Sequence, residues 1–126
     1  MVDEFVASWE WVEAYFRDAV ERQKIDVPII LATVIGLRAR GYDTRFRAGQ
    51  SLYNLVISRA SQHGRLDEQA RIHISPGQNL WNREQGEVKV LYLKGRETAA
   101  DFRTDDPLAS SAFMDLLEAL EQEPIV

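Results

Sequence analysis

The chain has 126 residues, of which 45% are hydrophobic and 28% are charged, and its formal net charge at pH 7 is −5. This length and composition predict a single globular domain over residues 1–126 and leave no room for two ordinary hydrophobic cores. The absence of cysteine from the sequence excludes disulfide bonds, thiolate zinc sites and a cysteine nucleophile. Neither a secretory signal nor an apolar run long enough to span a bilayer is visible, so we expect a cytoplasmic protein without a membrane partner.

The first predicted element is a helix from Asp3 to Gln23. Trp11 and Tyr15 lie away from its main apolar face and form either a second packing surface or an exposed aromatic pair. Because a tryptophan is usually well buried, we favour packing. The main face follows from apolar residues at spacings of three and four, and it consists of Phe5, Trp9, Val12, Phe16 and Ala19 with Val20.

Residues 28–40 are typical either of a helix or of a buried strand, because many β-branched side chains occur in a segment of helical length. Pro28 suits the first helical turn, and Asp26 suits its N-cap. Arg38 and Arg40, followed by glycine, form a helix stop signal. We therefore favour the helix.

From Tyr42 onward, apolar and polar residues alternate, which predicts strands. Residues 44–48 and 52–60 form a predicted hairpin with its turn at residues 48–51. Further strands are predicted at residues 70–75, with Ile72 and Ile74 inward, and at residues 87–95, where Val88, Val90 and Tyr92 lie on the side opposite to Lys89, Leu91 and Leu93; residues 79–87 are a candidate for another short strand.

A loop of acidic and small residues follows, and Asp106 with Pro107 opens a predicted C-terminal helix. The expected fold class is α+β, with two N-terminal helices, an antiparallel sheet of about four strands and a closing helix, in the order ααββββα. The predicted apolar stripe of the last helix consists of Leu108, Ala112, Leu116, Ala119 and Leu120.

The net charge conceals an uneven distribution along the chain. Residues 1–37 carry three basic and seven acidic side chains, residues 38–96 carry eleven and five, and residues 97–126 carry one and eight. The predicted sheet is therefore basic, while the helical ends are acidic. Twelve of the fifteen basic residues are arginine, whose guanidinium group can hold a carboxylate or a phosphate through two parallel hydrogen bonds.

Strand alternation places basic side chains on the outward face of the predicted sheet. Four apolar residues, Leu52, Val56, Leu91 and Leu93, share this face, and a mixed apolar and basic surface favours contact with another protein. A solvated face whose arginines pair with acids of the terminal helices is the structural alternative. We predict a small non-catalytic domain that binds a macromolecular partner, in the first place a protein, through Arg45, Arg47, Arg71, His73, Lys89, Leu91 and Leu93.

A calcium-binding protein is the first alternative function. Hard cations take several oxygen ligands from a flexible loop, and four carboxylates lie within a stretch of ten residues. Their spacing differs from the helix-loop-helix calcium pattern. The candidate metal ligands are Glu97, Asp101, Asp105 and Asp106, and no other cofactor is expected.

Three further possibilities carry less support. A nucleic-acid partner for the basic face is disfavoured by a pI of about 5.0 and by the lack of a recognition motif. A homo-oligomer would form if the acidic side of the last helix met the basic sheet of a second copy. Enzyme activity is not expected, because the proximity of Ser61, His63 and Asp67 in sequence does not make a catalytic triad.

Overall fold

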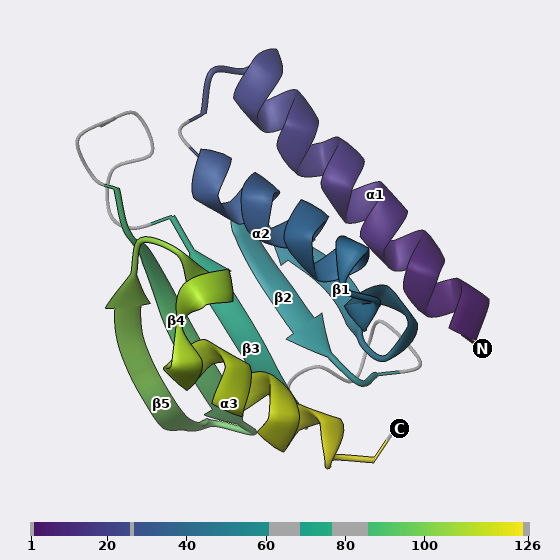
Figure 1. The fold of residues 1–126 in the computed structure, drawn as a ribbon, viewed down its shortest axis with the longest axis vertical. Coiled ribbons are helices and arrows are strands. Elements are labelled where there is room, and N and C mark those ends of the chain that lie inside the picture. The colour runs from purple at the N-terminus through teal and green to yellow at the C-terminus, as the bar shows by residue number, and fades with distance from the viewer. Residues whose placement is uncertain (1, 26, 61–68, 77–85, 125–126) are drawn as a thin grey trace.

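Figure 1 shows the computed structural model, which describes residues 2–25, 27–60, 69–76 and 86–124. The predicted α+β class and the order of two helices, sheet and helix are confirmed, with five strands in place of about four. The elements in chain order are α1 (Val2–Glu21), α2 (Pro28–Ala39), the 3₁₀ helix η1 (Tyr42–Thr44), β1 (Arg47–Ser51), β2 (Asn54–Ser58), β3 (Ala70–Ser75), β4 (Val88–Lys94), β5 (Glu97–Thr104), the 3₁₀ helix η3 (Pro107–Ala109) and α3 (Ser111–Glu121).

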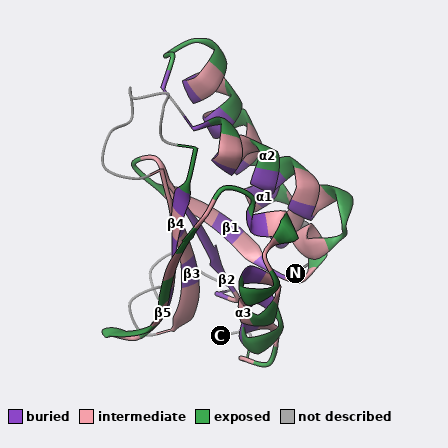
Figure 2. Cartoon of the chain, turned by 60° about the vertical axis from the view of Figure 1, so that its left-hand side comes forward, coloured by how far each residue is buried: buried purple, intermediate pink, exposed green. Residues whose placement is uncertain are grey.

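The strands form one antiparallel sheet in the order β1-β2-β3-β4-β5, so each strand pairs with its neighbour in the sequence. The helices lie on one side of this sheet, as Figure 2 shows, and the hydrophobic core fills the space between the two layers. We call the opposite side the outer face; no helix of the described part covers it. Strand side chains that point into the core are Leu55, Ile57, Ile72, Ile74, Val88, Val90 and Tyr92.

The main face of the first helix and the helical assignment of the second are both confirmed. In α1, Phe5, Trp9, Val12, Phe16 and Ala19 are buried. In α2, proline occupies the first turn, and the N-cap residue makes no side-chain capping bond. The predicted cap, Asp26, lies outside the described residues. None of the helices in the described ranges is long and apolar enough to cross a membrane.

A glycine within α2 has a packing reason. Leu108 of η3 packs against Gly36, and its side chain occupies the place where a Cβ atom on this glycine would stand. The absence of a side chain therefore lets the segment before α3 approach the second helix closely, which offsets the cost of glycine inside a helix.

The turn of the first hairpin lies at Leu52 and Tyr53, so its prediction at residues 48–51 is wrong. Gly49 is part of a regular strand, although glycine often marks a turn. Leu52 takes the positive φ of 58° that the reversal needs, and its carbonyl oxygen accepts a hydrogen bond from the Tyr15 hydroxyl at 2.7 Å. A contact from α1 thus supports a turn that the local sequence does not indicate.

The segment predicted as an acidic loop forms strand β5 and the turn that follows it. Gly95, with φ of 59°, reverses the chain directly after β4, so that residues 97–104 pair with β4. The register shifts between Tyr92 and Leu93, and Ala99 is the extra residue of this bulge. Pairing with β4 makes these residues a strand although alanine and acidic residues have low β propensity.

The start of the last helix also differs from the prediction. Asp106 accepts a hydrogen bond from the Leu108 amide and opens η3, whereas α3 begins after Ser110, whose hydroxyl accepts from the Phe113 amide. The buried residues of α3 are Phe113, Leu117 and Leu120, so the predicted stripe through Ala112, Leu116 and Ala119 is one position out of phase.

Candidate functional site: the outer face of the sheet

Six of the seven predicted contact residues lie on the outer face. In β3, the buried Ile72 and Ile74 point to the helices, so Arg71 and His73 point away from them. In β4, the same alternation places Lys89, Leu91 and Leu93 on the outer face, and Arg47 reaches it from β1.

The register joins these side chains into two neighbouring rows across the sheet. One row runs from Arg47 through Ser58 and Arg71 to Leu93. The next row runs through Gly49, Val56, His73, Leu91 and Asp101. Side chains at directly opposite positions lie about 4.5–5.5 Å apart at Cβ, so each row is a line of contacts.

The seventh predicted residue, Arg45, does not belong to this face. It follows η1 and precedes β1, where its Nη1 lies 3.3 Å from a carboxylate oxygen of Glu121 in α3. Its guanidinium carbon lies 4.3 Å from the centre of the Tyr42 ring. The prediction extended strand alternation back to this residue, but β1 begins only at Arg47, so the alternation does not apply.

The centre of the outer face is more buried than strand alternation predicts. Val56 is 4% exposed and Ser58 is 1% exposed. Leu91 and Leu93 are half-buried, as are the basic residues between them and β2. The outer face is therefore an apolar centre with basic side chains around and within it, not an evenly wetted surface.

The cations of this face make contacts within the protein. Lys89 Nζ lies 3.8 Å from an oxygen of Asp101. The Arg71 guanidinium donates to the carbonyl oxygens of Gln69 at 3.1 Å and Gly95 at 3.2 Å. These contacts hold the side chains of Lys89 and Arg71 in place on the outer face.

His73 occupies the middle of the apolar centre. Val56 and Leu91 lie opposite it on the two neighbouring strands, and its Nε2 is buried with no hydrogen-bond partner among the described residues. Burial, and to a smaller extent the positive charge of Arg71, lowers the pKa of His73 below its usual value of 6.5. At neutral pH this side chain is therefore a neutral polar group rather than part of the basic charge.

We expect the free energy of unfolding to fall in mildly acidic solution. Above about pH 6.5, His73 is neutral in both the folded and the unfolded chain; below it, the unfolded chain takes up a proton that the folded chain resists. Stability is thus lost as the pH falls from the unfolded pKa toward the lower folded pKa. Urea unfolding between about pH 8 and about pH 5 should show a smaller loss for His73→Gln than for the wild type, whereas equal losses would contradict this assignment.

The four candidate metal ligands lie on β5 and in the turn that follows it. Glu97 and Asp101 lie on β5, where four residues of extended strand span about 13 Å. Asp101 contacts Lys89, and Asp106 caps η3 through the Leu108 amide. The described ranges contain no group of three or more histidine or acidic side chains placed to hold a metal ion. Ser61, His63 and Asp67 lie outside the described residues.

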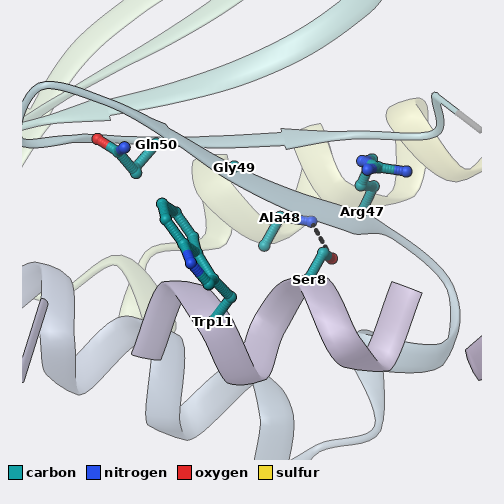
Figure 3. A pocket seen from close by; sticks show the side chains of 6 residues that line it. All are labelled: Ser8, Trp11, Arg47, Ala48, Gly49 and Gln50. Carbon is teal, nitrogen blue, oxygen red and sulfur yellow. Dashed lines mark hydrogen bonds between the residues drawn. The ribbon is translucent and has the colours of Figure 1, made fainter. Parts of the chain in front are cut away.

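A hollow between α1 and β1 is a feature that sequence reasoning missed (Figure 3). Trp11 stands over it, is 57% exposed and stacks on Tyr15 with ring centres 5.8 Å apart, so the packing predicted for this tryptophan is wrong. The volume of about 190 Å³ is below the roughly 300 Å³ at which small-molecule sites begin. The lining residues are Ser8, Trp11, Arg47, Ala48, Gly49 and Gln50.

The chain matches no protein-family model, no curated protein and no solved structure. A function for the outer face is therefore argued from its geometry and chemistry alone.

Proposed function

We propose that this protein is a non-catalytic, cytoplasmic interaction domain that binds a protein partner through the outer face of its sheet. The observation that carries the proposal is the placement of Leu91 and Leu93 beside Arg71 and Lys89 on a face that no described helix covers. An apolar centre with charged groups at its border is the usual composition of a protein interface.

Each part of this surface has a distinct role in the proposal. The leucines exclude water from the contact and contribute affinity through the apolar surface that they bury. Arg71 and Lys89 favour a partner that presents carboxylates, which affects the rate of association and the choice of partner more than the affinity. His73, whose pKa is lowered by burial, adds no charge to the contact at neutral pH.

Replacing the two leucines tests whether the partner binds at the outer face. Immobilised Leu91→Ser/Leu93→Ser protein should retain at least about tenfold less partner from a cell lysate than the wild type. Ile35→Ser in α2 is the matched control, because Ile35 is 40% exposed on the helical side of the molecule. Lys89→Glu provides a second, single change on the same face.

Circular dichroism must show that each variant is folded. Equal capture of the same protein by the wild type and by a folded double variant would exclude the outer face. A gel shift with RNA or DNA that weakens steeply with added salt would favour a nucleic-acid partner instead.

A further inference from the structure

The two edges of the sheet are β1 and β5, and they differ in what covers them. Along β1, the Ala48 amide donates to Ser8 Oγ at 2.9 Å, so α1 takes up a backbone group that points outward. β5 pairs with β4 on one side, and Figure 1 shows no described element along its other side. An uncovered edge strand presents unpaired N–H and C=O groups to another strand.

The register identifies which residues of β5 point their backbone groups outward. Because the Ala48 amide points away from β2, the neighbouring Gly49 is hydrogen-bonded to Val56. Bonded and non-bonded pairs alternate along an antiparallel strand and across successive strands. Along the row Gly49, Val56, His73, Leu91 and Asp101, this alternation leaves the Asp101 backbone pointing away from β4. By the same rule, the backbone groups of Arg103 also point outward, whereas those of Phe102 are hydrogen-bonded to β4.

A second copy can pair with this edge in one favourable register. When two β5 strands run antiparallel with Phe102 facing Phe102, Asp101 of each copy lies opposite Arg103 of the other. Both residues have outward backbone groups, so these are hydrogen-bonded pairs, and both side chains lie on the outer face. Shifting the register by two residues in either direction places Asp101 opposite Asp101 or Arg103 opposite Arg103, which is repulsive.

At the β5 edge of a single chain, the charged side chains are not all matched by opposite charges among the described residues. Arg103 lies opposite Lys89 in the register, so two cations face each other. The Arg103 side chain is exposed and has no ion-pair partner among the residues that the structure describes. Asp101, already 3.8 Å from Lys89, has a side chain that is 51% exposed. A second copy would supply the missing carboxylate to Arg103 and a second cation to Asp101.

The remaining residues of the edge fit the same register. Phe102 is only half-buried and lies on the helical side of the sheet, opposite Val90. Facing phenylalanines form a non-hydrogen-bonded pair, the closer of the two pair types, and aromatic cross-strand pairs are favourable. The bulge at Ala99 interrupts the edge, so the regular part available for pairing is Ala100–Thr104.

We propose that two copies of this chain associate through antiparallel pairing of their β5 edges, centred on Phe102, into one continuous ten-stranded sheet. The contact is isologous, because each copy offers the same surface, and two-fold symmetry doubles the Asp101–Arg103 pair. This contact is independent of Leu91 and Leu93.

Charge exchange tests both the edge and the register. Asp101→Arg and Arg103→Asp each create two like-charge contacts in the dimer and should each raise its dissociation constant by about 100-fold or more. Asp101→Arg/Arg103→Asp restores opposite charges and should restore the dimer. The two single variants, mixed, should form a heterodimer. Sedimentation velocity over a concentration series measures all four.

Glu97→Arg is the matched control, because it makes the same charge change on the same strand before the bulge, and it should leave the dimer intact. Arg103→Pro removes an outward N–H without removing a bond to β4, and it should give a folded monomer. A wild type that stays monomeric up to its solubility limit would overturn the proposal. The proposal would also be overturned if the Asp101→Arg and Arg103→Pro variants were folded and formed the dimer with an unchanged dissociation constant. Leu91→Ser/Leu93→Ser should dimerise normally, which separates this contact from the proposed partner site.

Discussion

Trp9→Ala should lower the free energy of unfolding by about 3–5 kcal/mol. The indole is fully buried, and its Nε1–H donates to the carbonyl oxygen of Phe46 at 2.8 Å. The truncation therefore leaves a large cavity and removes the hydrogen-bond donor from a buried carbonyl group. Since small domains are stable by only about 5–15 kcal/mol, much of the folding free energy would be lost. A urea titration followed by circular dichroism measures the change.

Two companion variants separate the causes of this loss. Trp11→Ala makes the same chemical change two positions away, but its side chain is 57% exposed, so the cost should be below about 1 kcal/mol. Trp9→Phe keeps an aromatic ring and removes only the donor and part of the volume, which should cost about 1–3 kcal/mol. Equal losses for the two tryptophans would contradict the burial that the structure assigns to them.

Leu117→Ala should cost about 2–5 kcal/mol, the second large effect. Leu117 is 2% exposed and lies between Phe113 and Leu120, which are also buried, on the side of α3 that faces the core. Truncation leaves a cavity in the contact that holds this helix against the sheet.

The neighbouring leucine provides a matched control for this prediction. Leu116 is only half-buried, so Leu116→Ala should cost about 1 kcal/mol or less. One residue turns an α-helix by about 100°, and the comparison therefore tests the phase of α3. A larger loss for Leu116→Ala than for Leu117→Ala would favour the stripe predicted from the sequence over the structure.

The error in that stripe has a specific origin. Starting the helix at Asp106 placed Leu108 in its first turn and set the phase of all later residues. The structure ends a separate 3₁₀ helix at Ala109 and starts α3 anew after the Ser110 cap. Because Phe113 and Leu116 are both apolar, hydrophobicity alone fits two phases, and the cap decides between them.

The sequence pattern does not predict strand β5, and the reason differs from that for α3. Its sequence lacks the strict alternation of a half-buried strand, since an edge strand gains its order from backbone pairing with one neighbour. The signal that could have revealed it is the turn. Gly95 and Arg96 form a two-residue connection after a strongly predicted strand, and such a connection is typical of a hairpin.

For the candidate site, strand alternation predicted the direction of side chains well and their burial poorly. It assigned Arg71, His73 and Lys89 to one face because each flanks an inward aliphatic residue. The burial of His73 depends on Val56 and Leu91, which stand on the neighbouring strands. The register between strands determines which residues lie opposite each other, and the sequence of one strand does not reveal that register.

The cover that α1 places on β1 limits how large an assembly can grow. A sheet with two available edges can add copies at both ends and lengthen into a fibre. Here the Trp9 indole donates to the Phe46 carbonyl oxygen just before β1, and the Ala48 amide of β1 donates to the Ser8 hydroxyl, so α1 lies against this edge, whereas Figure 1 shows no described element along the free side of β5. In the proposed dimer, the β5 edges of the two copies pair with each other, so no third copy can add at that edge. The position of the first helix beside β1 thus favours a closed pair over an extended fibre.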